Sequence, residues 1–414
     1  MYVFFTKNIG KLRSVFLYIL ASIFSSFIGI VVNPFLAKKM THIDYSVIGY
    51  YSSLLYLLTP IISMSLTTYY AKDYYILDKE SRMKLKSTLI CLFLILGVIN
   101  FIIFNGLYYF YHEFFISRSI AYFPFAILSF LPVYFTNFYN IYLLDLRLEN
   151  KSVKYFLLMI GNSILSAILS LIFVYYFYEG EGALGRLLAL FISSFLIAIY
   201  CFFSINVSIL NFSKKLAKKV LTFCWPLILS SLFSFFYLGV DRIFLIKLND
   251  NYNLGLYNIA VQISGYIGIF ATIIFQTFEP DIFKYSSKKE FKNLYIISGT
   301  VLGMITISVI AFVVLSDFIV DLLTAGRFLE STKYAIILSF KNITMNIAFI
   351  LATIIIGMGY SKVDLYVKIF GAIVSYIIFY FMINKYNFIG AAYAQVLCWL
   401  IISMVNLIIL KYIN

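Results

Sequence analysis

Residues 88–110 read Thr88-Leu-Ile-Cys-Leu-Phe-Leu-Ile-Leu-Gly-Val-Ile-Asn-Phe-Ile-Ile-Phe-Asn-Gly-Leu-Tyr-Tyr-Phe110 and contain no charged side chain. A helix needs about 20 mostly apolar residues to cross the hydrocarbon of a bilayer, and this stretch is long enough. Similar apolar runs lie at 14–34, 46–68, 121–144, 155–178, 184–205, 221–246, 255–278, 294–316, 333–356, 363–383 and 389–411. The sequence therefore predicts twelve transmembrane helices.

The composition of the whole chain supports this prediction. Hydrophobic residues make up 63% of the 414 positions and charged residues 12%, against roughly 45–50% and 25% in soluble domains. Twelve spans of about 21 residues use most of that hydrophobic content, so little remains for an extramembrane domain. We expect an all-α polytopic membrane protein.

The cysteines give no sign of a disulfide or a metal site. The four cysteines stand singly inside apolar segments, without a C-x-x-C pair, and read as small apolar side chains that fill space. We expect neither a metal nor any other cofactor.

The chain has 32 Lys and Arg against 18 Asp and Glu, a net charge of +14. The basic residues lie in short loops between apolar runs, which indicates an orientation signal and attraction to lipid headgroups, and not nucleic-acid binding. With the N-terminus inside, 22 of the 32 basic residues fall at inner membrane ends, whereas the acidic residues divide evenly. The positive-inside rule therefore predicts that both termini are cytoplasmic.

Short patterns recur at about half the chain length. Ser22–Phe27 in span 1 matches Ser231–Phe236 in span 7, with an offset of 209 residues. Gly49-x-Tyr51 matches Gly255-x-Tyr257, and Gly182-Ala183 matches Gly390-Ala391, with offsets of 206 and 208. The repeat predicts two six-helix bundles, 1–213 and 214–414, related by a pseudo-twofold axis along the membrane normal, with a site between them.

Several motifs together resemble a known family. They are Asp44-Tyr-Ser-Val-Ile-Gly49-Tyr-Tyr51, Leu146-Arg147-Leu-Glu149-Asn-Lys151 with Tyr155, Trp225-Pro226, Gly239-Val-Asp241-Arg242, Gly255-Leu-Tyr257-Asn-Ile-Ala260 and Gly390-Ala-Ala392. This set is similar to the Wzx-type flippases of O-antigen and exopolysaccharide repeat units, within the multidrug/oligosaccharidyl-lipid/polysaccharide (MOP) exporter superfamily. The resemblance implies a MATE-like fold. It also implies transport of an undecaprenyl-diphosphate-linked oligosaccharide from the cytoplasmic to the periplasmic leaflet of a bacterial inner membrane, with other polysaccharide assembly proteins as candidate partners.

Basic residues inside the spans are the first candidates for binding such a lipid, because a diphosphate cannot be left unpaired in hydrocarbon. Arg242 lies near the outer end of span 7, and Lys341 lies about eight residues into span 10 from the outer side. Lys368 and Arg147 lie near the cytoplasmic ends of spans 11 and 4. For Arg242 the alternatives are that it pairs with the adjacent Asp241 or snorkels to headgroups. For Lys368 and Arg147, which lie near the interface, snorkelling is the alternative, whereas the deeper Lys341 is expected to face the cavity.

Polar side chains in the spans could hydrogen-bond sugars or simply bridge helices. They include Asn33, Asn137, Asn140, Asn162, Asn258, Gln262, Asn342, Asn346 and Gln395, of which Asn33, Asn258 and Gln262 are the site candidates. Asp241 could carry a coupling proton or sodium ion, or form a structural pair with Arg242.

Three other functions remain as alternatives. A cation-coupled multidrug antiporter of the same superfamily would favour buried carboxylates, whereas the deeper charges here are mostly basic. A lipid II flippase of the related group typically has 14 spans, and a membrane polymerase or glycosyltransferase needs a long external loop with catalytic acids. No G-x-x-x-x-G-K-[ST] loop for ATP occurs, although outward movement of two negative charges gains roughly 5 kcal/mol per 100 mV of inside-negative potential.

Overall fold

The structure, a computed structural model, describes residues 2–74, 77–116, 120–205 and 211–413, with side chains from residue 16 onward except residue 361. Its elements are helical throughout these ranges. They are α1 (Tyr2–Lys39), α2 (His42–Ser63), α3 (Leu66–Asp73), α4 (Lys79–Phe115), α5 (Phe125–Leu148), α6 (Ser152–Ile172), η1 (Phe173–Phe177), α7 (Gly182–Ser204), α8 (Lys214–Leu238), α9 (Val240–Leu245), η3 (Ile246–Leu248), α10 (Asn251–Ser287), α11 (Phe291–Val314), α12 (Ser316–Thr324), η4 (Leu329–Ser331), α13 (Thr332–Gly357) and α14 (Ser361–Ile413).

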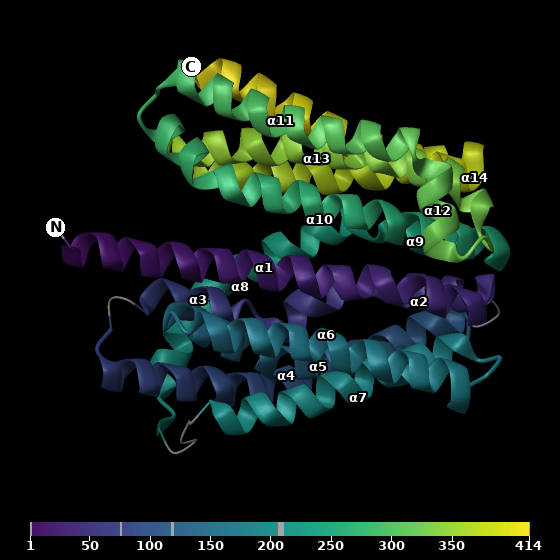
Figure 1. Cartoon of the computed structure of the whole chain (residues 1–414), viewed down its shortest axis with the longest axis horizontal. Coiled ribbons are helices and arrows are strands. Elements are labelled where there is room, and N and C mark those ends of the chain that lie inside the picture. Colours follow the sequence, from purple (N-terminus) through teal and green to yellow (C-terminus); the bar gives the residue numbers. More distant parts are fainter. Residues whose placement is uncertain (1, 75–76, 117–119, 206–210, 414) are drawn as a thin grey trace. The chain divides into compact units, whose positions relative to one another are not determined.

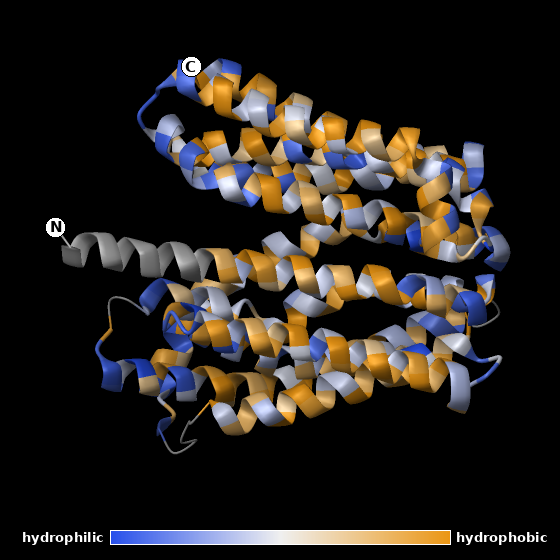
Figure 2. Cartoon of the chain, viewed as in Figure 1, coloured by the Kyte–Doolittle hydropathy of each residue, from blue (hydrophilic) through white to orange (hydrophobic). Residues whose placement is uncertain are grey.

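Within these described ranges, eleven helices are long and apolar enough to cross a membrane. Figure 2 shows apolar residues along the helices and hydrophilic residues gathered towards many of their ends. Large apolar side chains face outward, for example Leu107 on α4 and Ile307 on α11, each 68% exposed. A surface of this kind is stable in lipid and not in water.

The last helix contains two spans. α14 has 53 residues, which at 1.5 Å per residue is about 80 Å and far exceeds the roughly 30 Å of hydrocarbon. It is broken at Asn387, whose φ of 52° and ψ of −132° are not helical. At Gly390 an added Cβ would lie 2.0 Å from the carbonyl oxygen of Met382, so only glycine fits this close reversal. The predicted spans 363–383 and 389–411 fall on the two halves.

Three details differ from the predicted spans. α8 ends at Leu238, and the short α9 follows Gly239, where a single span to residue 246 is expected. α6 continues as the π-helical turn η1. The predicted span 46–68 is interrupted, because α2 ends at Ser63 and the short helix α3 begins at Leu66 and continues to Asp73, beyond the predicted end.

Contacts divide the chain into two compact units, Met1–Met40 with Leu54–Leu232 and Thr41–Ser53 with Phe233–Asn414. Whether two six-helix bundles divide at residue 213 stays a prediction. In the first unit, α1 packs against α6, and α5 packs against α7 (Figure 1). The Phe93 ring of α4 stacks on Tyr134 of α5 with centroids 4.9 Å apart.

In the second unit, α13 packs against α10, α11 and α14 (Figure 1). The core between these helices is apolar and includes Phe275, Val301, Ile305 and Ile350, each no more than 8% exposed. All four cysteines of the chain are buried and free. The predicted all-α polytopic architecture is confirmed.

Candidate functional site

The adjacent residues Asp241 and Arg242 form a buried ion pair on α9. Arg242 Nη1 lies 2.9 Å and 3.1 Å from the two carboxylate oxygens of Asp241, and its backbone N–H donates to the first of them at 3.0 Å. Asp241 is 0% exposed and Arg242 is 6% exposed. Of the two alternatives for Arg242, the geometry favours pairing over snorkelling.

Two further donors complete the environment of the Asp241 carboxylate. The Tyr257 hydroxyl of α10 donates to Oδ2 at 2.7 Å, and Gln395 Nε2 of α14 donates to the same oxygen at 3.0 Å. With the bonds from Arg242, the carboxylate accepts five hydrogen bonds. A carboxylate has about four lone-pair sites, so this one is saturated.

Asn258 joins these residues to the start of α2. Its Oδ1 accepts from Arg242 Nε at 3.4 Å, and its Nδ2 donates to the carbonyl oxygens of Tyr45 and Ser46 at 3.3 Å and 3.5 Å. We call Asp241, Arg242, Tyr257, Asn258 and Gln395 the Asp241 cluster. Its members come from α9, α10 and α14, and the pair within it has no net charge.

Lys341 of α13 adds a positive charge beside the cluster. It lies close enough to interact electrostatically with both Arg242 and Asp241, and its side chain is half-buried. Within the described ranges, its ammonium has no hydrogen-bond or ion-pair partner. Because Arg242 already neutralises Asp241, the three groups together carry a net charge of +1. A cation of this kind inside a span is suited to binding an anion.

The structure brings only some of the predicted residues together. Gln262 lies one turn beyond Asn258 on α10, where it is exposed and donates to the Tyr266 hydroxyl at 3.0 Å. Lys368 instead pairs with Asp364 at 2.7 Å in the first turns of α14. The two residues are four apart on one helix, a spacing at which opposite charges commonly pair, so the Lys368 charge is satisfied without a ligand.

The remaining two candidates lie in the first unit. Asn33 is 3% exposed on α1, and Arg147 is exposed at the end of α5. The Arg147 carbonyl accepts from the Tyr18 hydroxyl at 3.5 Å. Their roles in a site stay predictions.

Two features of these units do not follow from the sequence. Tyr257 belongs to the sequence repeat and to a family motif, but neither pattern predicts that its hydroxyl donates to Asp241. In the first unit, Asp145 of α5 pairs with Lys86 of α4 and accepts from the Tyr70 hydroxyl at 2.7 Å. Both were hard to detect because a helical sequence does not reveal which of its faces meets a neighbouring helix.

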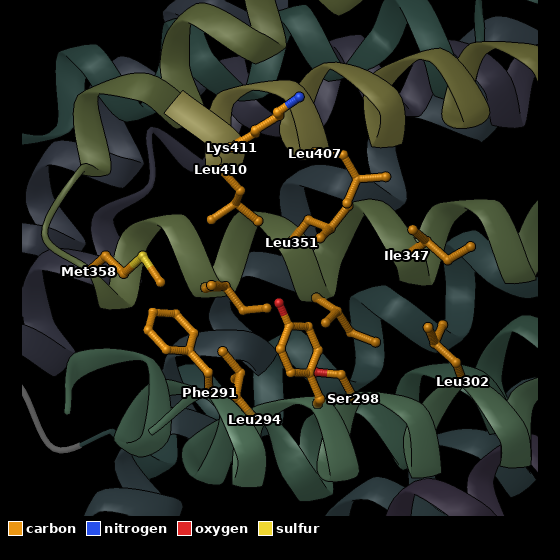
Figure 3. Close-up of a pocket in the computed structure, with 13 residues that line it drawn as sticks. Phe291, Leu294, Ser298, Leu302, Ile347, Leu351, Met358, Leu407, Leu410 and Lys411 are labelled. Atoms are coloured by element: carbon orange, nitrogen blue, oxygen red, sulfur yellow. The ribbon is translucent and has the colours of Figure 1, made fainter. Parts of the chain in front are cut away.

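A cavity lies in the second unit between α11, α13 and the end of α14, with a volume of about 440 Å³. Figure 3 shows its apolar side chains, among them Leu294, Ile347 and Leu351, with Lys411 at the edge beyond Leu410. Such a lining suits a hydrocarbon chain, in contrast to the polar Asp241 cluster.

Comparison with known proteins agrees with this architecture. The sequence profile described as "Polysaccharide biosynthesis protein" matches residues 11–286. The chain is 31% identical over 257 residues to the capsular polysaccharide biosynthesis protein CapF of Staphylococcus aureus, a match that covers 59% of this chain and 64% of CapF. The matched region thus spans less than two thirds of that relative.

Solved structures share the fold. An inward-facing multidrug resistance MATE family transporter of the MOP superfamily has a TM-score of 0.71 at 15% identity, with 92% of each chain covered. The lipid II flippase MurJ in an inward closed conformation also has a TM-score of 0.71, at 17% identity, and covers 95% of this chain and 87% of its own. A multidrug transporter and a lipid II flippase therefore share the fold of this chain. The chain belongs to the polysaccharide biosynthesis protein family and has the MOP superfamily fold, which confirms the resemblance seen in its sequence.

Proposed function

We propose that this protein is a flippase for a lipid-linked oligosaccharide, with undecaprenyl diphosphate as the lipid carrier. It moves the repeat unit from the cytoplasmic to the periplasmic leaflet of a bacterial inner membrane, with both of its own termini in the cytoplasm. The observation that carries the proposal is Lys341, a membrane-embedded cation without an ion-pair partner in the described chain, beside a neutral Asp241–Arg242 pair.

The chemistry of the substrate fits this arrangement. A diphosphate needs cationic donors to leave water, and an ammonium group binds phosphate oxygens strongly in a medium of low dielectric constant. The glycan needs hydrogen-bond partners. Gln395 Oε1 and Asn346 Oδ1 are buried acceptors without a donor in the described part of the chain, and sugar hydroxyls could donate to such atoms.

The antiporter alternative receives less support from the same residues. A carboxylate that carries a proton or sodium ion must exchange its partners during transport, but the Asp241 carboxylate already accepts five hydrogen bonds. We therefore propose export driven by the membrane potential. Two negative charges that move outward gain roughly 5 kcal/mol per 100 mV, so coupling to protons or sodium is not required.

Reconstitution tests the function directly. Purified protein in proteoliposomes would receive a polyprenyl-diphosphate oligosaccharide, and the arrival of the glycan in the opposite leaflet would be followed with and without an imposed potential. We expect flipping that accelerates with a potential negative on the side of origin. Flipping that follows only a proton or sodium gradient would indicate ion coupling, and efflux of cationic dyes without any flipping would indicate the antiporter.

A further inference from the structure

A groove of about 980 Å³ opens in the first unit between α3 and the first turns of α8. Five lysines line it, namely Lys72, Lys214, Lys215, Lys218 and Lys219. We call it the lysine groove. No acidic residue is among its lining residues.

The groove gathers five lysines that have no acidic partner within the described part of the chain. Lys84, Lys151 and Lys368 each pair with a carboxylate nearby in sequence. Within the described ranges, none of the five groove lysines forms an ion pair. The nearest acid on α3, Asp73, interacts with the Tyr69 side chain. The repulsion among the five groove lysines is therefore not offset by acidic side chains, and this favours binding of an anion with more than one charge.

An aromatic floor gives the groove a fixed shape. The Lys72 ammonium lies 4.2 Å from the ring centroid of Phe223 and 5.7 Å from that of Tyr69. These two rings meet edge to face at 5.3 Å. The cation–π contacts hold Lys72 over the floor, beside the lysines of α8.

Other contacts fix the two walls to each other. Cys224 Sγ of α8 donates to the carbonyl of Ser65, the residue before α3, at 3.6 Å. At the start of α8, the Leu216 N–H donates to Ser213 Oγ at 3.4 Å, and the Ser213 N–H donates to Thr88 Oγ1 of α4 at 3.2 Å. The groove is thus built by packed helices, and its positive charge lies at a helix N-terminus, where the macrodipole adds to the attraction for anions.

The position of the groove along the chain indicates what it meets. The lysines of α8 directly precede an apolar run, so the groove lies at a membrane surface, and the positive-inside rule places that surface in the cytoplasm. An anion that reaches this surface together with a hydrocarbon tail is a phosphorylated lipid. A single phosphodiester carries one charge, whereas a diphosphate carries at least two in a compact group, which matches the density of lysines better.

We propose that the lysine groove binds the diphosphate headgroup of the lipid-linked substrate at the cytoplasmic leaflet before transport. This rests on the proposed function, since the substrate is the one named there. The groove is a loading site separate from Lys341, and it recognises the phosphates and not the sugar.

Lysine footprinting tests the site residue by residue. The full-length protein in nanodiscs of neutral lipid would be acetylated with and without farnesyl diphosphate, and the extent of modification would be read by mass spectrometry. We expect at least about fivefold protection of Lys72, Lys218 and Lys219. Lys288 and Lys292, at the end of α10 and the start of α11, are matched controls that should stay equally reactive. Equal protection of both sets, or of neither, overturns the proposal.

Two further arms identify the ligand and separate the proposals. Phosphatidylglycerol at the same concentration should protect the groove lysines far less, and equal protection by it overturns recognition of a diphosphate. The double variant Lys218→Gln/Lys219→Gln should lower the affinity for farnesyl diphosphate about tenfold or more, while Lys288→Gln/Lys292→Gln changes it less than about twofold. If the wild type flips lipid-linked glycan but the groove variants bind and flip normally, the groove proposal fails alone. If the wild type flips no glycan while farnesyl diphosphate still protects the groove lysines from acetylation, the proposed function fails.

Discussion

Gly49 of α2 lies directly against Asn258 of α10, because a Cβ added at Gly49 would lie 1.9 Å from Asn258 Cγ. Gly255, which matches Gly49 in the sequence repeat, is also in close contact, since an added Cβ would lie 2.2 Å from the carbonyl oxygen of His42. Both contacts lie within the second unit. The two equivalent glycines therefore let the starts of α2 and α10 cross closely, and Asn258 at this crossing accepts a hydrogen bond from Arg242 Nε.

Replacing these glycines should destabilise the second unit. Gly255→Ala would press a methyl group on a backbone oxygen that cannot move aside, and we expect a loss of about 1–3 kcal/mol in the free energy of unfolding. Gly49→Ala would displace the Asn258 side chain and its hydrogen bonds, with a similar cost. Thermal unfolding of the purified variants in detergent measures both losses.

Gly265 offers a matched control on α10. An added Cβ there would meet nothing within 4 Å, so Gly265→Ala should leave the midpoint unchanged or raise it, since alanine favours a helix by up to about 1 kcal/mol over glycine. If all three variants unfold alike, the close crossing of α2 and α10 is wrong.

The fold was largely predictable because lipid imposes a simple rule on the sequence. Every span must supply about 20 apolar residues, so an apolar run such as 88–110 shows where a membrane span lies in the sequence. The short helix α3 and the break at Gly239 do not follow from that rule. They depend on side-chain packing, which a count of apolar residues does not include.

The site was predictable only in part, for a related reason. Asp241 and Arg242 are adjacent in sequence, so their pairing could be named as an alternative at once. Tyr257 and Gln395 reach Asp241 from other helices, and their roles depend on how those helices are rotated. That Lys341 lies beside this pair, without an ion-pair partner among the described residues, follows only from the packing of α13.

The buried Lys86–Asp145 pair should stabilise the first unit. Lys86→Ala would leave the Asp145 carboxylate, which is 6% exposed, with the Tyr70 hydroxyl as its one side-chain partner within the described ranges. Loss of one partner of a buried pair costs about 3–5 kcal/mol, so the variant should unfold at a clearly lower temperature. Lys84→Ala on the same helix breaks only an exposed pair with Glu80 and should cost less than about 1 kcal/mol. Equal midpoints for the two variants would contradict this account.

Asp241→Asn distinguishes a structural carboxylate from a coupling one. The change leaves the buried Arg242 guanidinium without its counter-charge, and we expect an unfolding free energy lower by about 3–5 kcal/mol together with poor yield. Asp364→Asn, in the more exposed pair with Lys368, should cost less than about 1 kcal/mol. A stable Asp241→Asn protein that transports but no longer responds to a proton or sodium gradient would instead show that Asp241 carries the coupling ion.

Lys341 should be essential for transport but not for folding. Lys341→Gln removes a charge that no carboxylate neutralises within the described ranges, and a hydrogen bond to a charged group contributes about 1.5–3 kcal/mol. We therefore expect the initial rate of flipping at low substrate concentration to fall about ten- to a hundredfold. The purified variant should elute as a single species and unfold no earlier than the wild type.

The matched control for Lys341 is Lys368→Gln, because that ammonium already has Asp364 as its partner. It should retain most of the flipping rate. Lys341→Arg should recover more activity than Lys341→Gln, since it restores the charge and donors for phosphate oxygens. If Lys341→Gln flips at the wild-type rate, the cation beside Asp241 and Arg242 does not bind the substrate, and the diphosphate must be carried by other groups of the chain.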